Sequence, residues 1–224
     1  MFILAPAPIP RRSLFMKRIT VLLLAATLLF SCKQKDKHLD PNKQVDEGAV
    51  KGETYVSQDI GWTIAIPKGW TVVSRDQTEA NEKKGAEAIR KATNTAIDMS
   101  GLKHLISFQK DKFNSFMSTT EPFPNDSPGA FEDNCATVYK MIYEAYASQG
   151  IRSDTSSFVE VIHGHKFNSF HTTLYSKDGK VILRQLLYSK LINKKDFSVT
   201  INYNNEDDKK VMMDAFTNSS LKGD

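Results

Sequence analysis

The alternation of apolar and polar residues is most regular near the carboxyl end of the chain. Phe197, Val199, Ile201 and Tyr203 take every second position, with polar residues between them. Side chains of a strand point alternately to opposite faces, so this stretch predicts a half-buried strand. Runs of β-branched and aromatic residues predict three more strands before it, at residues 158–162, 167–176 and 181–191.

Short turns connect these predicted strands. Lys177-Asp178-Gly179-Lys180 places Asp-Gly between two extended runs, which is a strong hairpin signal, and successive hairpins make a sheet antiparallel. Earlier strands are expected at residues 62–66, 70–73 and 102–109. The proline-bearing stretch 113–128 predicts a loop with a short strand at 114–118. We expect this loop to be a contact surface, because long loops in compact domains are often functional.

Three segments have helical patterns. In residues 129–149 an apolar stripe predicts a packed helix that Asp126 or Ser127 caps; its members are Phe131, Cys135, Val138, Ile142 and Ala145. Residues 78–93 contain helix formers but few large apolar residues, so an exposed helix weakened at Gly85 is expected. Residues 207–218 predict a last helix that turns Val211 and Ala215 inward, together with Met212 and Phe216.

These elements define the fold class. Helices that cover an antiparallel sheet make an α+β domain, and we expect a single one at residues 53–221. Residues 32–52 are polar and charged, which predicts a disordered tether in front of it.

The first 31 residues differ from the rest. Basic residues stand at Arg11, Arg12, Lys17 and Arg18, without any acidic residue, and the apolar run 19–30 follows. This order is typical of a secretory signal peptide, and the run is too short to span a bilayer, which takes roughly 20 residues. Met16-Lys17-Arg18 itself resembles the start of a signal, so translation is expected to begin at Met16 rather than Met1.

The end of the leader, Leu29-Phe30-Ser31-Cys32, resembles the lipobox of bacterial lipoproteins. The resemblance implies cleavage before Cys32 and attachment of acyl chains to this cysteine, which would hold the protein on a membrane. Lys33 replaces the aspartate that retains some lipoproteins at the inner membrane, which favours the outer membrane. An ordinary secretory signal with an incidental cysteine is the alternative.

Charge argues against a nucleic-acid partner. Four of the 30 basic residues lie in the leader, which leaves 26 basic and 26 acidic residues in the mature chain. Nucleic-acid binding domains usually carry a basic patch and a high net charge.

A second resemblance concerns the folded body. The opening Trp62-Thr63-Ile64-Ala65-Ile66-Pro67-Lys68-Gly69-Trp70, a strand followed by a proline-glycine turn and a tryptophan, is similar to the start of PsbP-like domains. The strand 197–203 and the short helix after it resemble their end. The resemblance covers residues 53–221 in element order and implies an antiparallel sheet between helices and a non-enzymatic interaction domain.

The candidate chemistry is sparse. His163 and His165 lack an evident third metal ligand, and His171 lies about 20 Å from His165 along a strand, so no metal site is expected. Cys135 lies in an apolar stripe, which favours a core role over a reactive thiol. No nucleophile or dinucleotide motif occurs, so we expect neither an enzyme nor a cofactor.

Aromatic residues leave two readings open. Seven of them either fill the core, which we favour, or line a cleft for a small ligand: Trp62, Trp70, Phe113, Phe116, Phe123, Tyr143 and Tyr188. The leading hypothesis is a membrane-anchored lipoprotein that binds an envelope protein partner. A small-ligand-binding lipoprotein is the alternative, followed by a hydrolase with an unrecognised site.

Overall fold

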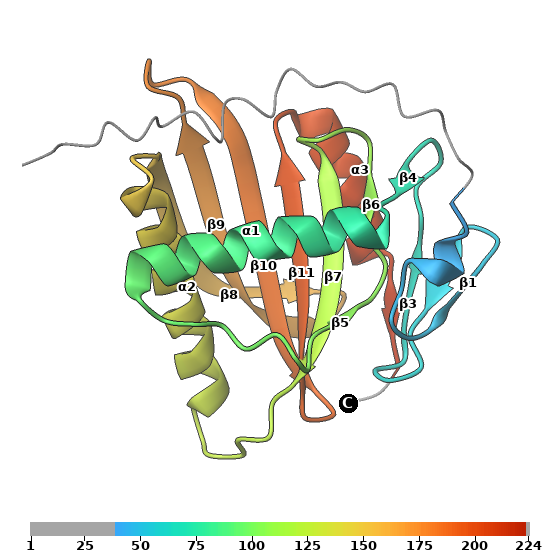
Figure 1. The fold of residues 1–224 in the computed structure, drawn as a ribbon. Coiled ribbons are helices and arrows are strands. Elements are labelled where there is room, and N and C mark those ends of the chain that lie inside the picture. Colours follow the sequence, from blue (N-terminus) through green and yellow to red (C-terminus); the bar gives the residue numbers. More distant parts are fainter. Residues whose placement is uncertain (1–38, 223–224) are drawn as a thin grey trace, which may run out of the picture. The chain divides into compact units, whose positions relative to one another are not determined.

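A computed structural model describes residues 39–222 of the chain, and a large antiparallel sheet forms its centre (Figure 1). The strand order is β4-β6-β7-β11-β10-β9-β8, and β5 pairs with β7 beside this path. The strands are β4 (Thr71–Val72), β5 (Lys103–His104), β6 (Phe108–Gln109), β7 (Ser115–Pro122), β8 (Arg152–Ile162), β9 (His165–Tyr175), β10 (Val181–Ile192) and β11 (Lys195–Tyr203).

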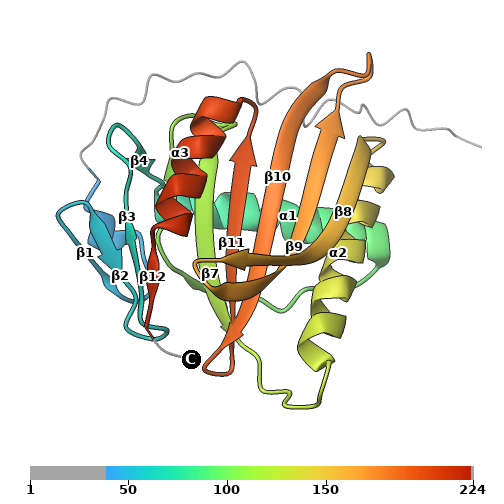
Figure 2. The same cartoon turned by 180° about the vertical axis from the view of Figure 1, so that it is seen from behind.

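A smaller antiparallel sheet has the order β1-β2-β3-β12. It contains β1 (Ala49–Lys51), β2 (Thr54–Val56), β3 (Trp62–Ala65) and β12 (Ser220–Leu221). Helices α1 (Arg75–Thr93) and α2 (Ala130–Ser148) lie on one face of the large sheet, while α3 (Glu206–Thr217) lies on the other (Figures 1 and 2). The expected single α+β domain, with helices on both sides of an antiparallel sheet, is confirmed.

The main core lies between the large sheet, α3 and the small sheet, and it is aromatic. Trp62 is 1% exposed and packs on Phe197 at 4.9 Å between ring centroids, and its indole nitrogen donates to Ser219 Oγ at 2.9 Å. Phe108 stacks on Phe116 at 4.6 Å. Met212 and Phe216 of α3 are fully buried here, whereas Val211 is exposed, contrary to expectation, because it lies on the outer side of the helix.

The folded body begins before residue 53, where the sequence pattern placed its start. A 3₁₀ turn covers Pro41–Lys43, and Val45 and Val50 are buried against the main core. The Asn42 side chain accepts from Val50 N at 2.7 Å and donates to its carbonyl at 3.1 Å. Two isolated valines in a charged segment give little sequence signal, so the second half of the expected tether, 32–52, is instead the entry to the small sheet.

The stretch 113–128 is less of a loop than predicted, because the short strand expected at 114–118 is real and extends further. Residues 115–122 form β7, which lies inside the large sheet and pairs with β11 along its whole length. Only 123–129 remain as a connection to α2. The buried positions of β7 are Phe116, Ser118 and Thr120. Two of these three residues carry hydroxyl groups, so the sequence lacks the apolar alternation that marks a half-buried strand.

Helix α2 confirms the predicted element with a shifted stripe. Phe131, Cys135 and Tyr139 are buried, one turn apart, while Val138 is 37% exposed. Neither Asp126 nor Ser127 caps the helix through its side chain, because Gly129 with φ of +80° takes the N-cap position. The predicted 177–180 hairpin is confirmed: Ser176 N donates to Lys180 O at 2.8 Å and Gly179 has φ of +81°.

Candidate functional site

The large sheet has two unlike faces. Side chains of β11 that point toward α3 are Phe197, Val199 and Ile201, all fully buried. The alternate positions point toward α1 and α2 and are polar. Strand register aligns one polar row across five strands of this second face: His104, Thr119, Ser198, Ser189 and Asn168. We call the residues of this face between β5 and β10 the polar floor.

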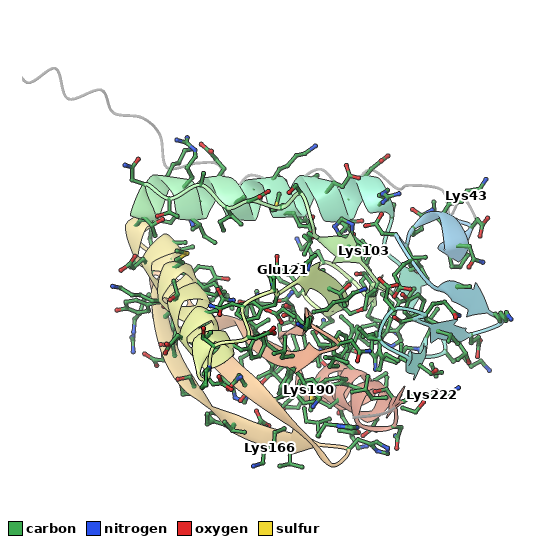
Figure 3. The ribbon with its side chains drawn as sticks, turned by 90° about the horizontal axis from the view of Figure 1, so that it is seen from below. Lys43, Lys103, Glu121, Lys166, Lys190 and Lys222 are labelled. Carbon is green, nitrogen blue, oxygen red and sulfur yellow. The ribbon has the colours of Figure 1, made fainter. Side chains whose placement is uncertain are left out.

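Helix α1 crosses the polar floor without packing tightly on it (Figures 1 and 3). Thr78 is its only buried residue, and no large apolar side chain of its first half faces the sheet. Floor residues such as Thr119 and Thr200 are only half-buried although the helix lies in front of them. Helices that pack on sheets usually bury an apolar stripe, so α1 is held here by polar contacts.

A cleft of about 460 Å³ opens between the first half of α1 and the floor. The helix contributes Arg75, Glu79, Glu82 and Lys83 to it. The opposite wall consists of Asp46 and of the segment that returns from α1 to β5, with Met99, Leu102, Lys103 and His104. We call this cleft the α1 groove.

His104 connects the two walls of the α1 groove. Its Nδ1 lies 2.7 Å from Asp46 Oδ2, and its Nε2 lies 2.8 Å from Glu82 Oε2. His104 thus contacts one carboxyl group on each wall of the groove. The bridge ties α1 to β5 through one side chain.

Other ion pairs complete the rim. Arg75 forms a salt bridge with Asp46 and lies 3.3 Å from Glu79 one turn further along α1. Lys195 and Lys103 both bind Asp59, and hydrogen bonding to these two lysines lowers the pKa of the Asp59 carboxyl. Lys83 is exposed at the rim and makes no ion pair within residues 39–222. The acids and bases of the groove thus mostly bind one another, which suits recognition better than proton transfer.

Two carboxyl groups lie beside the groove without such partners. Glu121 of β7 and Asp196 of β11 are directly opposite in the strand register. Burial raises the pKa of Asp196 to about 7, and a hydrogen bond from Ser198 only partly offsets this shift. Burial and then the charge of Asp98 raise the pKa of Glu121.

Of the predicted site residues, Cys32 lies outside the described residues, so its lipidation stays a prediction. Cys135 is 4% exposed, and burial raises the pKa of its thiol to about 12. A thiol with this pKa stays protonated near neutral pH and is a poor nucleophile. The predicted core role of Cys135 is confirmed.

The histidines do not converge on one another. His163 has φ of +49° in the β8–β9 turn, and His171 Nε2 lies 2.9 Å from Glu160 Oε1. Within residues 39–222, no group of three or more His, Cys, Asp or Glu side chains is arranged to hold a metal ion. The same part of the chain contains no helix long and apolar enough to cross a membrane.

The seven aromatic residues do not form a common cleft. Trp62, Phe116 and Tyr188 are fully buried in the main core. Trp70 packs edge-on against Phe108, Phe123 packs on Phe131 beneath α2, Phe113 lies under Lys112, and Tyr143 is 47% exposed. The cavity beside Trp62 measures only about 10 Å³, enough for a single water at most. The predicted core role therefore holds for three of the seven, Trp70 and Phe123 pack against a core cluster, and the aromatic cleft is not formed.

Sequence reasoning missed the α1 groove. Its residues come from three segments that are far apart in the chain, and no motif marks them. The sequence held one signal for it. The helix predicted at 78–93 has few large apolar residues and thus no apolar stripe to bury, so both of its faces must lie against polar groups or solvent.

Comparisons with known proteins address the fold. Neither the models of protein families nor the curated proteins yield a match for this chain. Among solved structures, the solution structure of cyanobacterial PsbP (CyanoP) from Synechocystis sp. PCC 6803 is similar, with a TM-score of 0.50 and 14% sequence identity. The similarity covers 78% of this chain and 98% of that chain. It confirms the PsbP-like fold expected from the sequence, and at this identity it concerns the fold alone.

Proposed function

We propose that the chain is an exported lipoprotein whose folded domain is a non-enzymatic binding module of the cell envelope. The leader 1–31 directs export, and Cys32 receives the lipid that holds the protein on a membrane. The outer membrane is favoured because Lys33 follows the cysteine.

The α1 groove is where this domain binds its envelope protein partner. The observation that carries this proposal is a helix that spans a polar sheet face without closing it. The walls of the groove combine charged groups with two apolar side chains, Met99 and Leu102. Protein interfaces have this composition of an apolar centre within a polar rim.

Site-specific photo-crosslinking in cells tests the groove. A photoreactive amino acid replaces Lys83 at the rim in one strain and Lys210, exposed on α3 at the other side of the sheet, in a second strain. We expect a discrete adduct from position 83 and none from position 210. Met99→Trp, which fills the groove, should abolish the adduct while the unfolding temperature of the protein stays within a few degrees.

Equal adducts from both positions, or an adduct that survives Met99→Trp, would contradict the proposal. A small ligand in place of a protein is the second candidate, because about 460 Å³ lies within the usual range of ~300–1,000 Å³ for ligand sites. Native mass spectrometry of protein extracted from membranes separates the two. A bound small molecule that Met99→Trp loses favours the ligand.

A further inference from the structure

Strand β8 forms one edge of the large sheet, and its outer side has no neighbouring strand within residues 39–222. Figure 2 shows it at the margin of the sheet, beside β9. All 11 residues of β8 pair with β9 in one continuous register, without a bulge. Such an edge presents a row of unpaired backbone groups, and proteins often blunt it with a proline, a bulge or a short strand. Strand β8 has none of these three features.

The side chains at the end of β8 are unusually apolar for an open edge. Val159 and Val161 are 60% and 66% exposed, more than any other large apolar residue that the structure describes, and the neighbouring Phe158 is 43% exposed. Exposed apolar residues on a long edge strand mark a surface that favours pairing with another chain.

The direction of the backbone groups restricts how a second strand can pair with β8. The Ser169 hydroxyl donates to the Phe158 carbonyl at 2.9 Å, so this carbonyl points toward β9. In an antiparallel ladder the backbone groups of successive residues point to opposite sides. The odd-numbered residues from Ser153 to Val161 therefore present their backbone groups outward. An antiparallel partner must place its own outward residues opposite these.

The charges along β8 indicate what the partner is. Arg152 and Glu160 are eight residues apart on the same face of the strand, because side chains alternate with a period of two. Arg152 packs over the Tyr175 ring at 4.5 Å but forms no ion pair within residues 39–222. If a second β8 pairs antiparallel about a two-fold axis at Ser156, Arg152 of each copy lies opposite Glu160 of the other. Opposite charges at directly opposed positions stabilise a sheet.

We propose that two copies of this chain form a dimer in which their β8 strands pair antiparallel, with Ser156 on the two-fold axis. Thr155 of each copy then exchanges backbone hydrogen bonds with Ser157 of the other, as the outward groups require. An axis at Ser157 would place Asp154 opposite Glu160, and these like charges disfavour that register. Strand β8 curves toward the side of the sheet that carries α3 (Figure 2), and an axis normal to the sheet makes both copies curve to the same side.

This interface is separate from the α1 groove and does not depend on the function proposed for that groove. The same patch of both subunits meets across the axis, which is the symmetric arrangement that most dimers adopt. Pairing would also satisfy the backbone groups that the free edge leaves open.

Disulfide formation in cells tests the pairing and its register. Directly opposed residues without mutual backbone hydrogen bonds have Cα atoms about 4.5 Å apart, which suits a disulfide. Ser156→Cys in the full-length protein should therefore give a disulfide-linked dimer on a non-reducing gel after mild oxidation. Thr155→Cys is the matched control, because this position is also exposed but lies about 8 Å from its own copy, beyond the reach of a disulfide. It should give no more dimer than the wild type.

Exchange of the charges tests the contact between the copies. Arg152→Glu places like charges opposite one another at both ends of the interface, so it should lower the yield of the Ser156→Cys dimer about fivefold. Adding Glu160→Arg makes the charges opposite again and should restore the yield. No dimer from Ser156→Cys, equal yields from positions 155 and 156, an adduct with a different protein only, or a yield that Arg152→Glu leaves unchanged would overturn the proposal.

Discussion

At the scale of single residues, polar groups in unusual surroundings define the face of the sheet beneath α1. His104 contacts the carboxyl groups of both Asp46 and Glu82, while burial raises the pKa of the Asp196 carboxyl to about 7. These are two different arrangements of buried acidic groups. At His104 two carboxyl groups share a basic partner, whereas at Asp196 burial without a basic partner favours the protonated acid.

Replacing His104 tests the first of these arrangements. His104→Ala leaves two partly buried carboxylates without their partner, so we expect the free energy of unfolding to fall by ~2–3 kcal/mol. Amide hydrogen exchange in the first half of α1 should accelerate as well. His171→Ala is the matched control, since His171 pairs with a single carboxyl, that of Glu160, packs on Phe158 and is about one-third exposed. Equal effects of both substitutions on α1 exchange would contradict the bridging role.

Replacing Asp196 tests the second arrangement, a buried acid without a basic partner. Its pKa is about 7 in the folded protein and near 3.9 in an unfolded chain. Between these values the folded state holds a proton that the unfolded state has lost, so the associated stability is complete below about pH 4 and disappears as the pH rises through 7. Asp196→Asn should flatten this decline and be more stable than the wild type at pH 8, by ~1–3 kcal/mol.

Urea unfolding at pH 5 and pH 8 measures the effect, with Asp133→Asn as the control. An unchanged pH dependence in the Asp196 variant would show that the carboxyl is ionised in the folded protein.

Some residue roles followed from the sequence and others did not. Cys135 was placed in the core because its neighbours at helical spacing are apolar. The opposition of Glu121 and Asp196 was invisible, because it depends on the register between strands more than 70 residues apart in the chain. Register is fixed by the whole sheet, and a single polar residue carries no information about its partner on another strand.

At the scale of elements, α1 differs from the other helices. Helices α2 and α3 each bury aromatic side chains, and these stripes could be read from the sequence. Helix α1 is long and capped by Ser74, whose hydroxyl accepts from Gln77 N at 3.3 Å, but it buries little. Its stability thus depends more on intrinsic helix propensity than that of a packed helix.

Gly85→Ala tests this dependence. A Cβ at Gly85 meets no atom within 4 Å, and alanine is the better helix former by ~0.5–1 kcal/mol. We expect the variant to unfold at a higher temperature, as measured by circular dichroism. Gly129→Ala also meets no atom, but its φ of +80° strains an alanine, so this control should be destabilised. A loss of stability in Gly85→Ala would mean that α1 is not free of packing at this point.

The strand β7 shows why an element was predicted too short, at 114–118 instead of 115–122. Its buried positions include Ser118 and Thr120, and Ser118 Oγ donates to the carbonyl of Ile106 at 2.6 Å. The strand is therefore held by backbone pairing on both sides and by hydroxyl contacts, not by an apolar stripe. Pro122 can end it because the last residue of a strand tolerates the loss of a donor.

At the scale of the whole molecule, the pairing of strands that are neighbours in sequence was predictable, and the pairing of strands far apart in sequence was not. The hairpins from β8 to β11 join neighbours in sequence through short turns, so alternation and turn residues were enough to predict them. The small sheet joins β3 to β12 across more than 150 residues, with Trp62 opposite Leu221. Only the assembled core reveals that contact, and only it shows that residues 41–52 belong to the domain.

The domain has one filled aromatic core and one polar face that α1 leaves open, and we propose that its amino terminus holds it at a membrane. The open face matters for binding partners in the envelope only if the domain is displayed there. Lipid on Cys32 is therefore the central claim of the proposed function.

The most direct test combines the intact mass of the mature protein with cell fractionation, for the wild type and Cys32→Ala together. The account predicts a wild-type protein that begins at Cys32, carries acyl mass on it and sediments with membranes, and a variant that leaves the membrane fraction. A soluble wild-type protein without added mass would contradict the account and indicate a secreted protein instead.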